Sequence, residues 1–335
     1  MHRQDTLARM RAAIRERYGP PEVVAVRDVE RPVPAADQLL VRVSAASVNR
    51  ADLDNLYPRW QFLRLFLGLR RPRVPRLGLD VAGVVEAVGP DVTAFKRGDA
   101  VFGDMFAFGQ GAFAEYVCAP QRAFLLKPPR LSFEEAATLP HSGVLAVQAL
   151  RRRDGRTPHA GQRVLIAGAS GNVGPFALQI AKSLGTEVTG VASTEKLDFV
   201  RSLGADHVID YTSQDATRTG GPYDWIVDVE AHHGLRRWRH ALRPKGVYAA
   251  LGGPVGWFLS AAFVGPLLTL ATRKQIGVML WWKPFHPADV GTLTGLIEDG
   301  KVRPIIDRRF ALDDVAEALR YVDDGRARGK VVVVP

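Results

Sequence analysis

The chain has 335 residues, of which 47% are hydrophobic and 24% are charged, and its net charge is +10. This length exceeds the usual size of one hydrophobic core, so two domains are expected. The positive charges are scattered and no nucleic-acid-binding motif accompanies them, so the sequence predicts no nucleic-acid partner. Cys118 is the single cysteine, which excludes an intrachain disulfide and a four-cysteine zinc site.

The first 130 residues have the pattern of antiparallel β structure. Alternating apolar residues predict strands over Val23–Val29 and Leu39–Ser44, with proline-rich turns between them. Further valine-rich stretches and glycine-containing turns follow, so a β-rich domain is expected over residues 10–130. The first residues are charged and lack the apolar core of a signal peptide, which predicts a cytoplasmic protein.

Residues 59–76 mix apolar side chains such as Trp60, Leu65 and Leu69 with six arginines. This composition predicts a short basic amphipathic helix. Three roles remain open for it: ordinary packing over a cleft, a roof on a hydrophobic substrate channel, or peripheral contact with an anionic membrane.

From Ser132 the pattern changes to alternating helices and strands. Ser132 and Glu135 form a capping box that opens a helix. The alternation predicts a parallel sheet. Its expected strands are Val164–Ala167, Glu187–Ala192, His207–Ile209, Trp225–Val229 and Gly246–Leu251, with Gln275–Leu280 at the edge, where two subunits could meet.

The uncharged stretch 246–272 is long enough to raise the question of a membrane span. Glycine and proline interrupt it, so a strand, a loop and a short apolar helix are expected instead. The tail then predicts a strand over Asp307–Ala311, a helix over Asp313–Val322 and a terminal valine-rich strand, which return to the first domain.

The strongest motif lies between Val164 and Ser193. An apolar strand leads into a glycine cluster, a helix is predicted over Val173–Leu184, and a second strand follows directly. Glycines allow the backbone to turn tightly and approach a pyrophosphate, while the helix N-terminus attracts its negative charge. The frame predicts a dinucleotide-binding βαβ unit. Its candidate contacts are Gly168, Ser170, Gly171, Asn172, Val173 and Gly174.

The end of the second strand bears on which dinucleotide is bound. NAD-binding units usually carry an acidic residue there, whereas this strand ends in Ala192 and Ser193 and leaves room for a 2′-phosphate. Ser193 and Thr194 can donate hydrogen bonds to that phosphate, and Lys196 can neutralise it. These residues favour NADPH. Glu195 is the opposing evidence, and Lys196 has the alternative interpretation of a solvated helix residue.

The order of these segments resembles the medium-chain dehydrogenase/reductase superfamily, and within it the zinc-independent quinone oxidoreductase group. The resemblance covers nearly the whole chain from Met10. It is carried by strings that include ERYGPPEVV, SAASVNRADL, PRLGLDVAGVVEAVG, GASGNVGPFALQIAK and GKVRPIIDRRFALDDVAEALRYVDDGRARGKVVV.

The resemblance implies an α/β fold with two domains and an active site in the cleft between them. A GroES-like, β-rich catalytic domain is expected over residues 10–130. A Rossmann domain with a doubly wound parallel sheet is expected over 131–283, and a return segment over 284–335 completes the catalytic domain. The resemblance also implies a homodimer.

The same comparison predicts that the chain needs no metal. Zinc-dependent relatives place a cysteine where this chain has Val48 or Asn49, and a His-Glu pair where it has Leu79 and Asp80. Leucine offers no lone pair, so these residues cannot form a tetrahedral zinc shell. Without a Lewis acid, quinones and α,β-unsaturated carbonyls fit better than alcohols as substrates, because they accept hydride directly.

Several site residues follow from matching positions. Asn49 is expected beside the nicotinamide, where its amide would donate to a substrate carbonyl oxygen; the alternative is an asparagine that fixes a loop. Asp52 is expected to be structural. The cofactor contacts implied by the resemblance are Ser193, Lys196, Tyr211, Gly252, Gly253 and Phe285.

The sequence also departs from the family pattern. Leu145 stands where a threonine often contacts the cofactor, which weakens the expected nicotinamide contact. His141 and Tyr57 are candidate proton donors, with a structural role as the alternative for each. A reduced quinone can instead take its proton from solvent.

These observations lead to one functional hypothesis and its alternatives. The chain is expected to be an NADPH-dependent, zinc-independent reductase of quinones or activated alkenes that acts on a small hydrophobic acceptor. The alternatives are a zinc-free reductase of carbonyls or enoyl thioesters, and a non-catalytic protein that senses NADPH.

Overall fold

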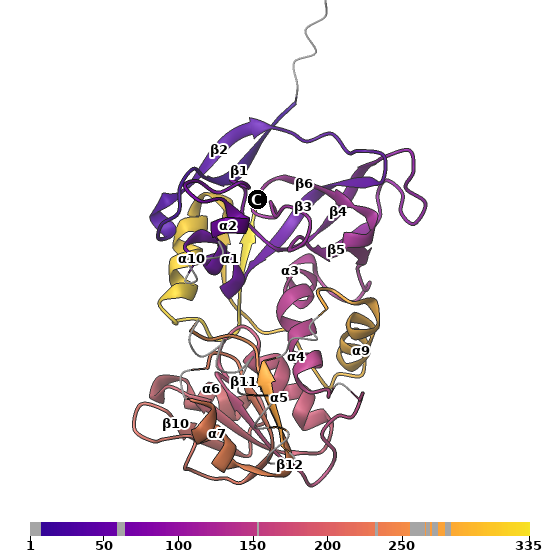
Figure 1. Ribbon diagram of the computed structural model, residues 1–335. Helices are drawn as coiled ribbons and strands as arrows, with labels where there is room; N and C mark the ends of the chain where they lie inside the picture. The colour runs from indigo at the N-terminus through magenta and orange to yellow at the C-terminus, as the bar shows by residue number, and fades with distance from the viewer. Residues whose placement is uncertain are drawn as a thin grey trace, which may run out of the picture. The chain divides into compact units, whose positions relative to one another are not determined.

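The computed structural model describes residues 8–58, 64–152, 154–231, 234–254, 265, 269, 274–278 and 283–335. The chain divides into two compact units (Figure 1). Unit 1 comprises Met1–His141, Ile306–Arg326 and Lys330–Pro335, and unit 2 comprises Ser142–Ile305 and Ala327–Gly329.

These boundaries differ from the expected ones at 130/131 and 283/284. The capping box predicted at Ser132 is present, because Ser132 Oγ accepts from the Glu135 amide at 3.1 Å and Glu135 Oε2 accepts from the Ser132 amide at 2.8 Å. Helix α3 (Phe133–Ala137), which it opens, belongs to unit 1. Helix α9 (Pro287–Glu298) belongs to unit 2, where Asp289 accepts a hydrogen bond from Gln148 at 2.7 Å.

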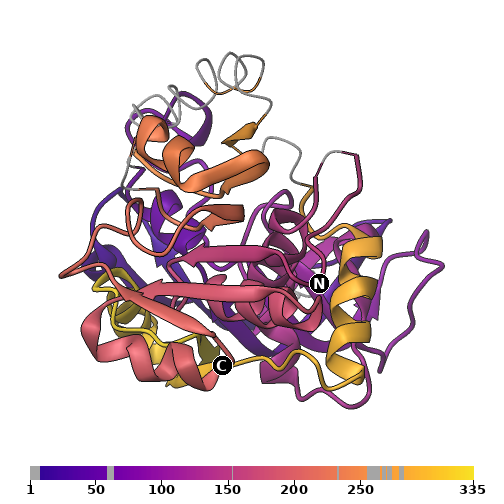
Figure 2. The ribbon, with the colours of Figure 1, turned by 90° about the horizontal axis from the view of Figure 1, so that it is seen from below.

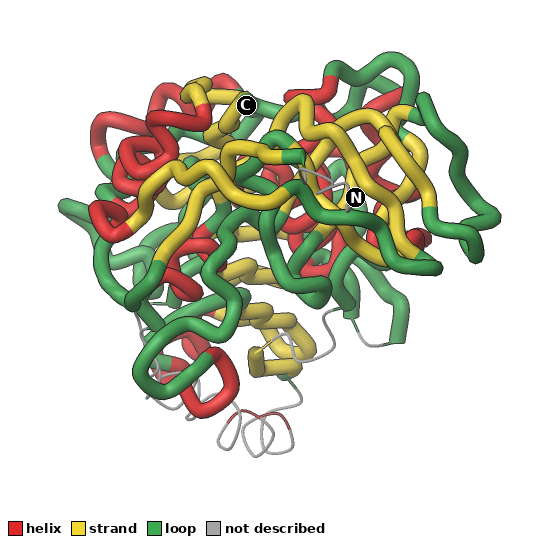
Figure 3. Tube along the Cα trace, turned by 90° about the horizontal axis from the view of Figure 1, so that it is seen from above, coloured by secondary structure: helices red, strands yellow, loops and turns green. Residues whose placement is uncertain are grey.

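Unit 1 is built mainly of antiparallel strands, which Figure 3 shows in yellow. Its strands are β1 (Arg9–Arg15), β2 (Val24–Glu30), β3 (Gln38–Val48), β4 (Asp80–Val88), β5 (Ala100–Asp104), β6 (Tyr116–Pro120), β7 (Phe124–Leu126), β14 (Ile306–Ala311) and β15 (Lys330–Val334). Its helices, besides α3, are α1 (Arg50–Leu56), α2 (Arg64–Leu67) and α10 (Val315–Asp323).

Strand β3 organises this unit. The main sheet has the order β14-β15-β3-β4-β5-β7, and β6 also pairs with β3. The tail strand β15 runs antiparallel to β3, with Val331 opposite Val48. Because β3 has neighbours along its whole length, it extends to Val48 rather than ending at Ser44 as expected. Strands β1 and β2 form a separate two-stranded sheet.

Unit 2 contains a parallel sheet in the order β10-β9-β8-β11-β12-β13. Figure 2 shows these strands side by side. They are β8 (Arg163–Ala167), β9 (Glu187–Ala192), β10 (His207–Asp210), β11 (Tyr223–Asp228), β12 (Leu242–Ala250) and β13 (Gln275–Val278). The helices, besides α9, are α4 (Val144–Ala149), α5 (Gly174–Ser183), α6 (Leu197–Ser202) and α7 (Leu235–Ala241).

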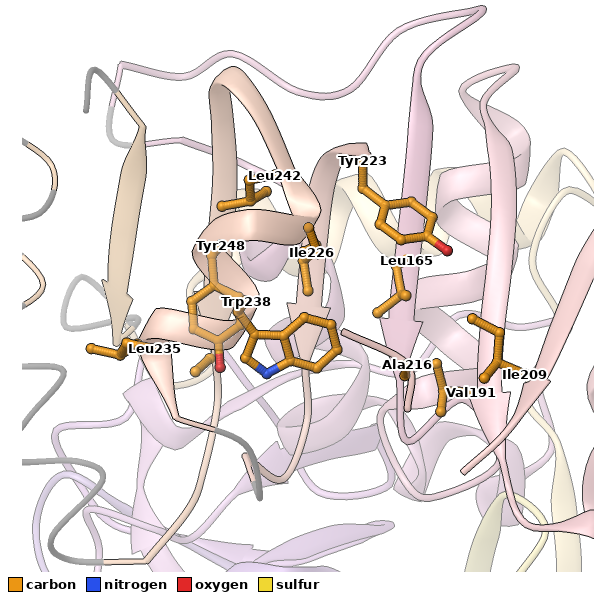
Figure 4. Packing of buried hydrophobic residues seen from close by; sticks show 12 residues of the cluster. Leu165, Val191, Ile209, Ala216, Tyr223, Ile226, Leu235, Trp238, Leu242 and Tyr248 are labelled. Atoms are coloured by element: carbon orange, nitrogen blue, oxygen red, sulfur yellow. The ribbon is translucent and has the colours of Figure 1, made fainter. Parts of the chain in front are cut away.

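The strand order reverses between β8 and β11, which is the topological switch point of a doubly wound fold. The predicted α/β fold with a doubly wound parallel sheet is therefore confirmed. A cluster of aliphatic and aromatic residues packs against this sheet, and within it Trp238 of α7 lies against Tyr248 of β12, with ring centroids 6.0 Å apart (Figure 4). In such folds ligands bind at the carboxyl ends of the strands, near the switch point.

Some expectations fall partly outside the described residues. Residues 59–63 of the arginine-rich insertion and residues 279–280 of the expected edge strand are among them. Most of 255–273, the second part of the uncharged stretch, also lies outside. Strand β12 (Leu242–Ala250) overlaps the strand expected over Gly246–Leu251 but begins four residues earlier.

Candidate functional site

The glycine turn after β8 has the shape expected of a phosphate-binding loop. Gly168 has φ +81°, a conformation that side chains rarely adopt. A Cβ on Gly174 would lie 2.2 Å from the Gly168 carbonyl oxygen, so only glycine fits there. Gly171, in contrast, has its nearest neighbouring atom 3.7 Å from such a Cβ. The turn therefore needs two of its glycines for its own folding and leaves the third open toward a ligand.

Helix α5 starts at Gly174, directly after this turn, with Val173 as its N-cap and proline in its first turn. A helix N-terminus presents unpaired amide groups and a partial positive charge, which suit a pyrophosphate. The turn also lies at the switch point, because the Val229 side chain after β11 approaches Gly168. The structure thus brings Gly168, Ser170, Gly171, Asn172, Val173 and Gly174 together in the place where a dinucleotide would bind.

The ends of the neighbouring strands contribute the other expected cofactor residues. Gly252 follows β12, and its carbonyl accepts a hydrogen bond from the Ala231 amide at 3.0 Å. Tyr211 follows β10; its side chain is 59% exposed and its amide donates to the Ala192 carbonyl at 3.2 Å. Gly253 comes directly after Gly252 in the same loop. Phe285 is buried in unit 2 and has φ +43°.

The expected 2′-phosphate residues lie just after β9. Ser193 is half-buried and precedes the short helical turn Thr194–Lys196. The hydroxyl of Thr194 donates to Asp210 Oδ2 at 2.5 Å and lies 3.0 Å from the Thr212 hydroxyl, so it already has hydrogen-bond partners within the protein. Lys196 is buried, and its Nζ donates to the Ala327 carbonyl at 3.0 Å, so it is not the solvated residue of the alternative interpretation.

A short piece of the tail, Ala327–Gly329, completes this region of unit 2. The Gly329 amide donates to the Ser170 carbonyl at 3.0 Å, and the exposed Arg328 donates from Nη2 to the Glu195 carbonyl at 3.2 Å. The tail thus contacts both the glycine turn and the end of β9. Sequence reasoning missed Arg328, because the tail was assigned to the first domain. The RARGK sequence was the available signal, since a phosphate site needs a cation nearby.

One further buried acid in unit 2 was not predicted. Asp228 is the last residue of β11, and it accepts a hydrogen bond from the Tyr248 hydroxyl at 2.8 Å. Burial raises the pKa of the Asp228 carboxyl to about 7. An acid directly after the apolar run Trp225–Val227 was the signal that could have revealed it.

Unit 1 contains a buried network of polar side chains centred on Asp80, the first residue of β4. Asp80 Oδ2 accepts hydrogen bonds from Ser47 Oγ at 2.9 Å and from Asn49 Nδ2 at 2.9 Å. Lys330 Nζ lies 3.5 Å from the same oxygen and donates to Asn49 Oδ1 at 2.6 Å. Lys330, in the tail strand β15, and Asp80 are both fully buried.

The electrostatics of the network follow from this burial. Removal from water raises the pKa of Asp80 and lowers the pKa of Lys330. Each group partly opposes the shift of the other, because an ion pair favours both charged forms. An isolated charge in this place would be very costly, so each of the two groups depends on the other.

Three more ionisable residues extend the network. The His141 amide donates to Asp80 Oδ1 at 3.0 Å, and His141 Nδ1 lies 3.4 Å from Asp104 Oδ2. Burial opposes protonation of His141, but the Asp104 and Asp80 carboxylates outweigh it and raise the imidazole pKa. Asp52 Oδ2 accepts from the Asn49 amide at 2.8 Å, and burial raises the pKa of Asp52 to about 7.

This geometry bears directly on the expected role of Asn49. Its side-chain amide is buried and hydrogen-bonded at both ends, to Asp80 through Nδ2 and to Lys330 through Oδ1. The Nδ2 group has two hydrogens, of which one is donated to Asp80 and the other to the Ser47 carbonyl at 3.4 Å, so donation to a substrate carbonyl would require one of these two contacts to break. The structure therefore favours the alternative interpretation, in which Asn49 fixes the junction between β3 and α1.

Of the other residues considered for the site, Tyr57, His141 and Leu145, only His141 belongs to this network. Tyr57 is the C-cap of α1, at the opposite end of the helix from Asn49, or about 12 Å along its axis. His141 lies in the network, as a partner of Asp80 and Asp104. Leu145 is a half-buried residue of α4 in unit 2.

The side chains at the expected ligand positions of zinc-dependent relatives differ from usual zinc ligands. Where a cysteine is expected the chain has Val48 or Asn49, and where a His-Glu pair is expected it has the buried Leu79 and Asp80, whose carboxylate accepts from Ser47 and Asn49. The Lys330 ammonium group supplies positive charge there instead. Within the described part of the chain, no group of three or more histidine, cysteine or acidic residues could hold a metal ion.

The described residues include no helix that is both long and apolar enough to cross a membrane. The cytoplasmic location stays a prediction.

Comparisons with known proteins agree with this architecture. Residues 35–130 match the alcohol dehydrogenase GroES-like domain, and residues 203–333 match a family described as zinc-binding dehydrogenase. The chloroplastic quinone-oxidoreductase QR1 of Triphysaria versicolor is 32% identical, with 97% of this chain and 98% of that protein covered. The chloroplastic NADPH-dependent alkenal/one oxidoreductase of Arabidopsis thaliana is 31% identical, with 97% and 80% covered.

A solved structure extends the same result. The quinone oxidoreductase from Coxiella burnetii superposes with a TM-score of 0.84 at 30% identity, and 98% of this chain and all of that chain are covered. The same family is therefore indicated by the matches to both domains, by the glycine turn and by the nearly full-length similarity. The chain belongs to the medium-chain dehydrogenase/reductase superfamily, in its quinone-oxidoreductase-like group.

Proposed function

We propose that this protein is an oxidoreductase that uses NADPH to reduce quinones or activated alkenes without a catalytic zinc. The observation that carries the proposal is the Asn49–Asp80–Lys330 network, which fills the expected metal position with an amide, a carboxylate and an ammonium group. Acceptors that are already polarised need no Lewis acid, and quinones and α,β-unsaturated carbonyls are of this kind.

The geometry of unit 2 supports a nicotinamide dinucleotide, and its charges support the phosphorylated form. The glycine turn and the start of α5 would hold the pyrophosphate. Ser193, Lys196 and Arg328 would bind the 2′-phosphate, because Ser193 and Lys196 follow β9 directly and Arg328 donates to the Glu195 carbonyl between them. When bound, the nicotinamide supplies the hydride. The names of relatives, which include an NADPH-dependent oxidoreductase of alkenals and alkenones, support the same choice.

The residues of unit 1 would contribute orientation rather than chemistry. Lys330 and Asp80 hold both ends of the Asn49 amide, which fixes the end of β3 and the start of α1. We assign His141 to this network, because its imidazole is buried and lies beside Asp104. The reduced oxygen of a quinone would then take its proton from water. The homodimer that the family resemblance implies stays a prediction.

The deciding experiment is NADPH oxidation by the purified protein, with an ortho-quinone and a simple enone as acceptors and excess EDTA present. NADH is the matched alternative cofactor. We expect turnover that prefers NADPH and is unchanged by chelation. Loss of turnover on chelation, with recovery on zinc addition, would contradict the zinc-free mechanism. NADPH binding without turnover of either acceptor would favour a cofactor-binding protein instead.

A further inference from the structure

One surface segment of unit 1 plays no part in the sites described above. Residues 64–73, the arginine–leucine segment, carry Leu65 and Leu69 with 58% and 66% of their surface exposed. Arg70, Arg71 and Arg73 are exposed beside them. The sequence has no acidic residue between Asp54 and Asp80. Two leucines are therefore exposed to solvent within a stretch whose charged residues are all basic.

The segment is held in this form by contacts that do not involve the leucines. The Tyr18 hydroxyl donates to the Gly68 carbonyl at 2.8 Å, and the Arg64 guanidinium lies 4.9 Å from the centre of the Tyr18 ring. Gly68 has φ +116°, and a Cβ there would lie 2.0 Å from the Arg71 carbonyl oxygen. The backbone turns tightly at Gly68 and is anchored at Tyr18. The two leucines are thus exposed on either side of a turn whose backbone is held by these contacts.

We propose that the arginine–leucine segment docks this protein on the surface of a bilayer that contains anionic phospholipid. Leu65 and Leu69 would enter the boundary between headgroups and acyl chains, and the exposed arginines would bind lipid phosphates. Negative charge alone could attract the arginines to a nucleic acid or an acidic protein. A bilayer is favoured because it also removes both leucines from water.

The expected binding is weak and reversible. Each exposed arginine near an anionic surface contributes about 1 kcal/mol, or about a fivefold gain in partitioning. Burial of a leucine side chain contributes about tenfold or more. The arginine contribution falls with salt, because the screening length shortens from about 10 Å at 0.1 M to about 3 Å at 1 M.

The test is flotation of the full-length protein with vesicles of two compositions. One contains phosphatidylcholine with about a third phosphatidylglycerol, and the other contains phosphatidylcholine alone; these are chosen because only the first carries net charge. We expect the protein to float with the anionic vesicles at low salt, to be released at 1 M salt, and not to float with the neutral vesicles. Absence of flotation with anionic vesicles at low salt would overturn the proposal.

Two variants of the segment and one control identify the surface. Leu65→Ser with Leu69→Ser, and Arg70→Gln with Arg71→Gln, should each lower partitioning by about tenfold or more. Val33 is 76% exposed and lies outside the segment, so Val33→Ser should leave partitioning unchanged. Circular dichroism and thermal unfolding confirm that all three variants are folded. Equal loss in the Val33→Ser control would show that the segment is not the docking surface.

Two further outcomes would also overturn the proposal. If the leucine variant floats as the parent does but reduces a water-soluble quinone more slowly, the segment covers the acceptor instead of docking on lipid. If single-stranded DNA at matched phosphate concentration binds as tightly as the anionic vesicles, and the leucine variant binds that DNA unchanged, the segment is a general polyanion surface.

Discussion

In unit 1 the candidate site is built from buried ionisable side chains, whereas in unit 2 it is built from backbone at the carboxyl ends of parallel strands. The Asp80–Lys330 pair depends on two side chains that meet from distant strands. The turn from Gly168 to Gly174 depends on glycine at both of its ends, within one short loop. In the first region the buried charges lose their hydration, which costs free energy. In the second region the backbone conformation is set by local steric contacts, which carry almost no such desolvation cost. The two regions should therefore respond differently to substitution.

The largest effect is expected in unit 1. Lys330→Met should lower the free energy of unfolding by about 3–5 kcal/mol, because it leaves the buried Asp80 without its cation. Urea unfolding followed by circular dichroism measures this. The double variant Lys330→Met, Asp80→Asn should recover most of the loss, since it removes both charges. A loss below about 1 kcal/mol in the single variant would show that Asp80 is already neutral in the parent.

The second prediction compares one buried acid in each unit. Burial raises the pKa of Asp52 and of Asp228 from 3.8 to about 7. Between these values the folded state keeps a proton that the unfolded state has released. The free energy of unfolding should therefore fall as pH rises through this window, by about 1.4 kcal/mol per pH unit for each group, and level off above it.

Single variants separate the two contributions. Asp52→Asn and Asp228→Asn should each flatten the pH dependence of urea unfolding between about pH 4 and pH 7, because each removes one titrating group. An unchanged slope in either variant would show that the carboxyl in question is ionised in the folded protein.

The third prediction concerns the glycine turn of unit 2. Gly174→Ala should lower the free energy of unfolding by about 1–3 kcal/mol and weaken NADPH binding, because the added Cβ meets the Gly168 carbonyl oxygen. Gly171→Ala is the matched control for folding, since its Cβ has ordinary contacts. Thermal unfolding and fluorescence titration with NADPH measure both variants. Equal stability of the two would show that the turn can relax.

The smallest effect is expected at the tail. Arg328→Ala should weaken NADPH binding by about tenfold and leave NADH binding unchanged, because it removes one cation near the end of β9. Arg326→Ala is the control, as Arg326 pairs with Asp324 at 3.0 Å and should not affect either cofactor. Parallel titrations with the two cofactors measure the ratio. A loss that is equal for NADPH and NADH would place Arg328 away from the 2′-phosphate.

The same contrast explains what the sequence could predict. The βαβ unit was predicted closely, including strand β9 over Glu187–Ala192, because strand, turn and helix signals all lie within about thirty residues. The hydrogen-bond partners of Asn49 were not predicted, since Lys330 is 281 positions away and no periodicity links the two residues. An amide has the same donors and acceptors whether it faces a substrate or a lysine. Arg328 was missed for a similar reason, because three residues of the tail leave unit 1 for unit 2.

The pairing of β15 with β3 also sets an order of events during synthesis. The ribosome makes all of unit 2 before residue 330, so the strands of its parallel sheet are present while the nascent chain is still growing. Unit 1 is completed only after Lys330 is made, because until then Asp80 lacks this cation and Ala46–Val48 of β3 lack their pairing with β15. Although it begins first, unit 1 is completed last.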